Sequence, residues 1–231
     1  MRDHARWLGK VGALVFGLAL GLALALPAAP AAPLDADLLL RGGTIHDGSG
    51  AAPAVGDVAV RDGRIVAVGK IEPGKIGRAI DCRGLVVAPG LIDVHTHSDG
   101  TIGNPKVRPC LNYLLQGCTT MVTGNCGGAS DAGKFLKDID ANGAGTNIAH
   151  LVGHGTVRQK VLGAARRAPT AEELDRMKAL VDEAMRQGAW GMSTGLIYAP
   201  GSYAETDEIV ALARVVAAHG GIYATHIRNE A

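Results

Sequence analysis

The pattern of apolar and polar positions divides the chain into three parts. Residues 1–31 begin with basic side chains and continue into an unbroken apolar run over 11–26. Residues 32–87 hold short apolar runs separated by Gly-containing turns, which is typical of strands. In residues 88–231, short apolar runs alternate with helical patterns, and that order is typical of βα units around a parallel sheet. We therefore expect a small β segment followed by an α/β domain.

The first part, residues 1–31, has the outline of a secretory signal peptide, with a basic start, an apolar run and a tail rich in Ala and Pro. The apolar run is shorter than the roughly 20 residues that a membrane-spanning helix needs. Ala29-Pro30-Ala31 fits the small-x-small pattern of a cleavage site. We expect export to the periplasm or the extracellular space, and the alternative is an uncleaved signal that anchors the chain in the membrane.

The second part carries a strong hairpin signal. Asp62-Gly63 separates the apolar runs 58–60 and 65–68. Asp-Gly favours the tight turn that joins two antiparallel strands, because both of its residues tolerate positive φ angles. The sequence therefore predicts a β-hairpin centred on this dipeptide.

The third part predicts both helices and strands. The clearest helix follows Thr170, which forms a capping box with Glu173, and its apolar side chains recur on one face until Gly188. We interpret the two methionines on that face as core residues. A second helix is predicted from Thr206 to His219, before two glycines. The predicted strands are 90–95, 119–125, 147–153, 189–196 and 222–226.

The composition is that of a globular protein, with 47% hydrophobic and 19% charged residues. The formal net charge is +1 and no basic stripe is present, so we expect no nucleic-acid partner. Export would allow disulfides to persist. A single bridge among Cys82, Cys110 and Cys118 fits the sequence, but spacing does not assign the pair.

The motif His95-Thr96-His97 at the end of an apolar run is the strongest candidate for chemistry. Alternate side chains of a strand share a face, so the two imidazoles lie about 6 to 7 Å apart on one side and can reach one metal ion. Asp93 lies two residues earlier on the same face. Its role is either to orient a ligand or to make a simple buried hydrogen bond.

Several segments of the chain resemble the amidohydrolase superfamily of metal-dependent hydrolases. The strand that ends in His95-Thr96-His97 is similar to the first barrel strand of that superfamily. Four later segments resemble its D-aminoacylase (N-acyl-D-amino-acid deacylase) branch: 116–127, Gly153-His154-Gly155, 193–201 and 224–230. The resemblance runs from about Ala36 to the end of the chain.

This resemblance implies an α/β fold of defined architecture. Residues 88–231 would form about the first five strands of a (β/α)8 TIM barrel, and residues 32–87 would form part of a small β-sandwich domain before it. In such a barrel the functional side chains stand at the C-terminal ends of the strands. A complete barrel needs about 250 residues, so we expect only its N-terminal portion here.

The resemblance also implies a site for one or two Zn2+ ions at those strand ends. Its ligands would be His95, His97, Cys126 and His226. Many amidohydrolases bridge two metal ions with a carboxylated lysine at the end of strand 4, but residues 191–196 contain no lysine. In the D-aminoacylase branch a cysteine on strand 2 is the metal ligand instead, and Cys126 matches its position. The alternatives are a buried or disulfide-bonded thiol for Cys126, and for His226 an imidazole that is exposed or only supports a ligand. His154 is more typical of a turn or pocket-lining residue than of a ligand.

The substrate implied by the resemblance is a small molecule, an N-acyl-D-amino acid. The segment after strand 4 would sort its side chain and acyl group through Ser193, Thr194, Leu196 and Tyr198. Arg228 could meet a carboxylate of the substrate, and the alternative is an ion pair with Glu230 or with a neighbouring helix.

The implied reaction is hydrolysis of the amide bond, in which a metal-activated water attacks the carbonyl and an aspartate moves the proton to the amine. Family members take that aspartate from strand 8 and a further histidine from strand 6, which we expect beyond Ala231. The chain as given is therefore expected to be inactive alone. The alternatives are a hydantoinase-like or dihydroorotase-like cyclic amidase, and a non-catalytic exported metal-binding fragment.

Overall fold

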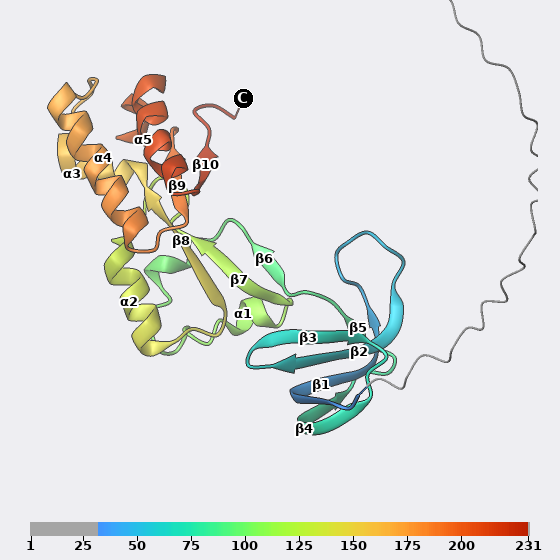
Figure 1. The fold of residues 1–231 in the computed structure, drawn as a ribbon. Helices are drawn as coiled ribbons and strands as arrows, with labels where there is room; N and C mark the ends of the chain where they lie inside the picture. Colours follow the sequence, from blue (N-terminus) through green and yellow to red (C-terminus); the bar gives the residue numbers. More distant parts are fainter. Residues whose placement is uncertain (1–31, 231) are drawn as a thin grey trace, which may run out of the picture. The chain divides into compact units, whose positions relative to one another are not determined.

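A computed structural model describes residues 32–230, which form two compact units that divide between Val87 and Ala88 (Figure 1). The expected signal peptide lies outside the described residues. Among the helices of residues 32–230, none is long and apolar enough to cross a membrane.

The first unit is one five-stranded sheet. Its strands are β1 (Leu34–Ile45), β2 (Ala54–Arg61), β3 (Arg64–Gly69), β4 (Pro73–Asp81) and β5 (Val86–Val87). The order is β3-β2-β1-β4, and β5 also pairs with β1. β2 runs antiparallel to β1 and β3, whereas β4 and β5 run parallel to β1. This separate sheet agrees with the expected β domain beside a partial barrel.

The predicted hairpin is confirmed between β2 and β3. Its turn residues Asp62 and Gly63 have φ angles of 51° and 69°, the left-handed values that an Asp-Gly turn tolerates. Val60 faces Ile65 and Arg61 faces Arg64 across the turn. The turn chemistry thus sets the pairing of the two strands.

The second unit is a five-stranded parallel sheet with helices. Its strands follow the chain order as neighbours: β6 (Leu91–Asp93), β7 (Cys118–Thr123), β8 (Asn147–Gly153), β9 (Gly191–Gly195) and β10 (Ile222–His226). All four pairings are parallel. Consecutive parallel strands with intervening helices are the arrangement of a barrel, and the expected partial TIM barrel is confirmed.

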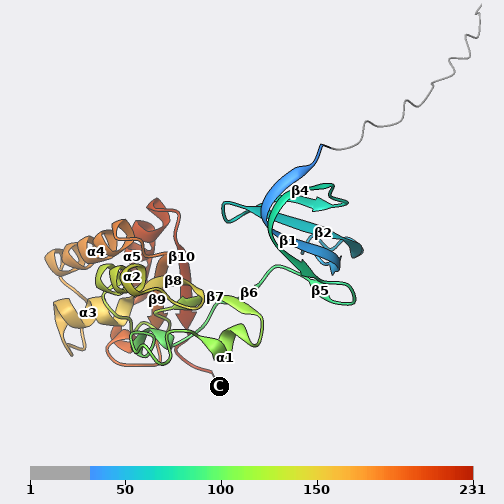
Figure 2. The same cartoon turned by 90° about the horizontal axis from the view of Figure 1, so that it is seen from below.

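The helices α2 (Ala132–Asn142), α4 (Ala171–Arg186) and α5 (Thr206–Ala218) lie beside the sheet, as both views show (Figures 1 and 2). The shorter elements are η1 (Ser98–Gly100), α1 (Leu111–Leu114), α3 (His154–Leu162) and η2 (Gly201–Tyr203). The capping box of α4 is confirmed, since Thr170 accepts from Glu173 N and the Glu173 carboxylate accepts from Thr170 N. Met177 and Met185 are buried core residues, as predicted.

Two predicted strands end two residues earlier than expected. β6 stops at Asp93, whose Oδ1 accepts a hydrogen bond from His95 N at 3.0 Å, so that the backbone turns out of the sheet. β7 stops at Thr123 because Gly124 and Cys126 have φ angles of 77° and 57°, which a strand cannot contain. His95, His97 and Cys126 therefore stand on the loops that follow these strands.

The expected disulfide is absent, since within residues 32–230 all four cysteines are free thiols. Cys110 and Cys118 are buried in one apolar cluster. Each thiol contacts a backbone oxygen instead of the other sulfur: Cys110 Sγ lies 3.1 Å from Arg108 O, and Cys118 Sγ lies 3.2 Å from Thr120 O. These two cysteines act as small core residues.

Candidate metal centre

The loop after β6 presents the His95 and His97 pair. Thr96 between them is buried, and both its backbone N and its Oγ1 donate to Val122 O at 3.0 Å. Because Thr96 is held against β7, the two flanking imidazoles lie on the other side, with ring centroids 5.3 Å apart. Asp93 Oδ1 accepts a hydrogen bond from His95 N at 3.0 Å, so this carboxylate holds the backbone of a candidate ligand.

The loop after β7 carries Cys126 and is clamped from β9. Ser193 Oγ donates to Gly124 O at 2.5 Å and accepts from Gly127 N at 3.0 Å, so one buried hydroxyl bridges both ends of the cysteine turn. Asn125 Nδ2 adds a bond to Val122 O at 2.9 Å. These hydrogen bonds hold the cysteine turn at both of its ends.

The two glycines of this turn are required by space as well as by conformation. A Cβ on Gly124 would lie 2.3 Å from Leu151 O, and a Cβ on Gly127 would lie 2.6 Å from Gly195 N. Both glycines also have positive φ angles, 77° and 72°. The backbone thus passes directly against β8 and β9, and this close approach places the thiol at the strand ends.

Three imidazole nitrogens converge on the thiol. Cys126 Sγ lies 3.4 Å from His95 Nε2, 3.5 Å from His97 Nε2 and 3.5 Å from His226 Nδ1. The donor atoms of His95, His97 and Cys126 all lie within 4.8 Å of one another. A tetrahedral zinc ion places its sulfur and nitrogen ligands about 3.5 Å apart. One thiol proton can serve only one nitrogen, so a cation suits the whole set better than hydrogen bonds do.

Burial raises the pKa of the Cys126 thiol, and the negative charge of Glu230 raises it further. A thiol in that state is protonated at neutral pH and is a poor ligand until a cation displaces the proton. Soft thiolate and imidazole donors together are typical of a zinc site. The donor set therefore fits the expected ion.

His226, the last residue of β10, is held by its neighbours. Its Nε2 lies 2.7 Å from Glu230 Oε1, and its ring stands edge-on to Tyr198 with centroids 5.0 Å apart. Leu196 N donates to His226 O at 2.8 Å. Leu196 therefore supports the backbone of a candidate ligand, and Tyr198, which is half exposed, covers one side of its ring.

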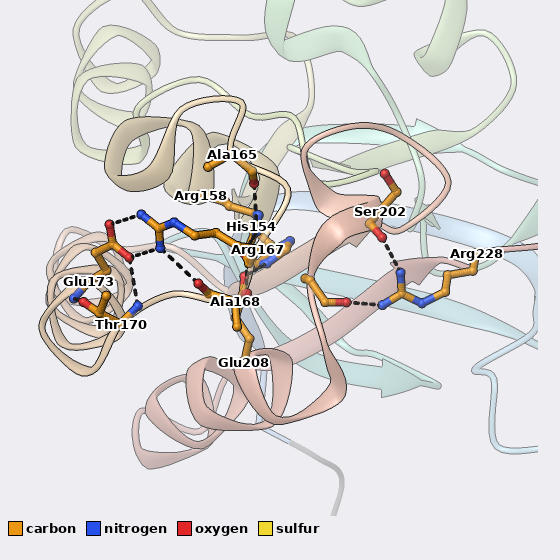
Figure 3. Close-up of polar contacts among 11 residues, drawn as sticks. His154, Arg158, Ala165, Arg167, Ala168, Thr170, Glu173, Ser202, Glu208 and Arg228 are labelled. Atoms are coloured by element: carbon orange, nitrogen blue, oxygen red, sulfur yellow. Dashed lines mark hydrogen bonds and ion pairs between the residues drawn. The ribbon is translucent and has the colours of Figure 1, made fainter.

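Arg228 makes its hydrogen bonds to backbone oxygens in the structure. Its guanidinium donates to Ser202 O at 2.7 Å and to Ala204 O (Figure 3). Glu230, the alternative partner, pairs with His226 instead. Arg228 is thus committed to the backbone of η2, where it ties β10 to the segment that precedes α5.

Ser193 and Thr194 are also placed differently from the expectation that they contact substrate. Both are fully buried. Ser193 clamps the cysteine turn, and Thr194 Oγ1 bonds to Tyr223 OH at 2.9 Å and Thr225 Oγ1 at 2.7 Å. Their hydroxyls are used inside the sheet. Of the four residues predicted to contact substrate, Tyr198 is the one that lines the cavity beside Cys126.

His154 takes part in a buried ionic network that sequence reasoning missed. Its Nε2 is 2.8 Å from Glu208 Oε1, and the other carboxylate oxygen accepts from Arg158 Nη1. Arg158 Nη2 donates to Arg167 O at 2.6 Å and Ala165 O at 3.3 Å (Figure 3). This network joins α3 to the first turn of α5, and His154 takes part in it through its Nε2 atom.

A cavity of about 440 Å³ lies beside Cys126. Its walls are mainly backbone and small side chains, with Tyr198 near the cysteine and polar side chains of α3 on another side. The lining residues are Cys126, Gly127, Gly128, Gly155, Thr156, Gln159, Lys160, Gly195, Tyr198, Ala199, Pro200 and Gly201.

Comparison with known proteins connects this geometry to a family. The amidohydrolase family matches residues 78–230. An N-acyl-D-aspartate deacylase and a D-aminoacylase of Alcaligenes xylosoxydans xylosoxydans are each 41% identical to this chain, over 87% and 84% of its length. The chain spans 45% of the length of both relatives.

The solved structures that resemble this chain include deacylases of the same kind. The N-acyl-D-glutamate deacylase of Bordetella bronchiseptica, complexed with zinc and a phosphonate inhibitor, has a TM-score of 0.79 at 35% identity, covering 85% of this chain and 46% of that one. A D-aminoacylase structure has a TM-score of 0.77 at 38% identity, covering 84% of this chain and 46% of that one. That D-aminoacylase has a binuclear metal centre.

Proposed function

This chain belongs to the amidohydrolase family, and we propose that the complete protein is a zinc-dependent hydrolase of the amide bond in N-acyl-D-amino acids. The convergence of three imidazoles on the Cys126 thiol carries this proposal. The similar proteins support the substrate class, because they are named as deacylases of N-acyl-D-amino acids.

The residues that would hold zinc are His95, His97, Cys126 and His226. When bound, such an ion lowers the pKa of a water ligand to near 7 and polarises a carbonyl oxygen. The thiol contacts a histidine pair from one strand end and a single histidine from another, so these four residues would hold one or two ions. Ser193 and Leu196 hold the ligand backbones in place, which reduces reorganisation during the reaction.

A carboxylate that moves a proton to the leaving amine is also needed. Two carboxylates of the described residues lie beside the cluster: Glu230 is paired with His226, and Asp93 accepts from His95 N. The edge strands β6 and β10 meanwhile expose Leu91, Ile92 and Ile222, which is unfavourable for a sheet that stays open. We propose that further strands complete this barrel and supply the proton-transfer aspartate, and that residues 32–231 alone are inactive.

The proposed function predicts stereoselective amide hydrolysis by the complete, zinc-loaded protein. N-acetyl-D-amino acids should be hydrolysed, whereas their L counterparts and cyclic hydantoins should react at least about tenfold more slowly. Chelation should abolish turnover and added Zn2+ should restore it. Release of free amino acid is the measurement, with residues 32–231 as the inactive comparison. Faster turnover of hydantoins than of N-acetyl-D-amino acids would instead support a cyclic amidase.

We also propose export of the mature chain, on the basis of the apolar run over 11–26 and Ala29-Pro30-Ala31. N-terminal sequencing of protein from a bacterial periplasm or culture medium should find a start near Ala32. An intact Met1 on protein recovered from the cytoplasmic fraction would contradict export.

A further inference from the structure

The cavity beside Cys126 has a marked asymmetry of charge. Among the described residues that line it, no Asp or Glu is present, and Lys160 is the one permanently charged side chain. Lys160 stands in the last turn of α3. A cavity of about 440 Å³ that joins a metal cluster to a lysine is large enough for a small acylated amino acid.

The ammonium of Lys160 is available to a ligand. Its Nζ lies 3.5 Å from Asp131 Oδ2, but both side chains are about half exposed, at 51% and 55%. An exposed pair at that separation is weak, because water screens it. Asp131 has a separate role as the N-cap of α2, where it accepts from Lys134 N. Lys160 can therefore leave Asp131 without disturbing the cap.

The other basic candidate for this role is already occupied. Arg228 was expected to meet a carboxylate, but its guanidinium donates to two backbone oxygens. Gln159 precedes Lys160, lines the same cavity and is exposed. An ammonium beside an amide provides the charge-assisted hydrogen bonds that a carboxylate prefers.

We propose that Lys160, with Gln159 beside it, binds a carboxylate of the substrate and so helps to determine specificity. This inference rests on the proposed function, because it identifies a substrate group at that same site. The carboxylate is either the α-carboxylate, which all N-acyl-amino acids share, or the side-chain carboxylate of an aspartate or glutamate derivative. The two sources predict different substrate profiles.

The test replaces Lys160 in the complete, zinc-loaded protein. Lys160→Met keeps the length of the side chain and removes its charge, Lys160→Arg keeps the charge, and Lys137→Met on the exposed face of α2 is the matched control. KM and kcat are measured for N-acetyl-D-glutamate, N-acetyl-D-aspartate and N-acetyl-D-methionine. We expect Lys160→Met to raise KM at least about tenfold, because the variant loses a hydrogen bond between two charged groups. kcat should change less than about threefold, since the lost contact stabilises the bound substrate and the transition state equally.

The substrate profile shows which of the two carboxylates Lys160 binds. A rise in KM for all three substrates assigns Lys160 to the α-carboxylate, whereas a rise confined to the two acidic substrates assigns it to the side chain. Lys160→Arg should recover most of the affinity, and Lys137→Met should behave as the wild type. Circular dichroism confirms that the variants are folded.

A binding measurement separates this inference from the proposed function. Calorimetry with D-glutamate, which carries both carboxylates but has no amide bond to hydrolyse, needs no turnover on the complete zinc-loaded protein, and Lys160→Met should weaken that binding about tenfold as well. Lys160-dependent binding without hydrolysis of any N-acyl-D-amino acid would overturn the proposed function and leave the carboxylate site standing. KM and Kd values within twofold of the wild type in Lys160→Met would overturn the site.

Discussion

Replacing Cys126 by alanine in the complete protein is expected to remove most of the bound zinc and to lower kcat/KM for an N-acyl-D-amino acid at least about 100-fold. Loss of a residue that merely supports a ligand costs about 10- to 100-fold in metal affinity or activity, and Cys126 is itself within 3.5 Å of three imidazole nitrogens. The measurements are zinc content by atomic absorption and the initial rate of amino-acid release.

Cys118→Ala is the matched control for this experiment. Cys118 is also a free thiol, but it is buried in an apolar cluster and its sulfur contacts Thr120 O. Its removal should leave the zinc content unchanged and lower stability by about 1 kcal/mol. Equal zinc content and equal activity in the two variants would refute the assignment of Cys126, and so would a mapped disulfide that contains it.

Local signals explain why much of the fold could be predicted from the sequence. The Asp62-Gly63 turn and the Thr170 capping box depend on a few consecutive residues, and both occur where expected. The five parallel strands were predictable because buried strands are short apolar runs between turn signals. Their ends were less predictable, since β7 is terminated by the left-handed conformation of Gly124 and Cys126.

The support of the site could not be predicted, because it depends on contacts between distant parts of the chain. Ser193 is separated from Gly124 by 69 positions, and only the folded sheet shows that its hydroxyl clamps the cysteine turn. A serine near a predicted strand end is equally typical of a substrate contact, which is the role that the resemblance implied. Burial distinguishes the two roles, and burial of a single polar side chain is not visible in a hydropathy pattern.

The same reasoning applies to Glu208, which looks like an ordinary acidic residue in the first turn of a helix. In the structure it is 3% exposed and is paired with His154, 54 positions away, and with the fully buried Arg158. Burial opposes ionisation of Glu208, but the hydrogen bonds from His154 and Arg158 and the charge of Arg158 outweigh it, so the pKa of this carboxyl lies below its ordinary value.

Glu208→Gln is expected to lower the free energy of unfolding by about 3 to 5 kcal/mol, because it leaves the buried Arg158 guanidinium without a counter-charge. Asp207→Asn changes an exposed carboxylate in the same first turn, and it should cost less than about 1 kcal/mol. Urea unfolding of the complete protein at pH 7, followed by circular dichroism, measures both. A loss below about 1 kcal/mol in Glu208→Gln would show that the network does not stabilise the unit.

The pH dependence gives this prediction a second, independent readout. A carboxyl whose pKa is lowered by folding contributes stability that is fully present above its unfolded pKa and is lost as the pH falls through its folded pKa. With an ordinary value of 4.5 for Glu208, the wild type should keep its advantage over Glu208→Gln at neutral pH and lose it progressively below about pH 4.5. The two unfolding curves should therefore converge in acid, because the protonated carboxyl of Glu208 and the amide that replaces it in the variant are both neutral. A stability difference that stays constant from pH 7 to pH 3 would mean that the ionised form of Glu208 is not what holds α3 to α5.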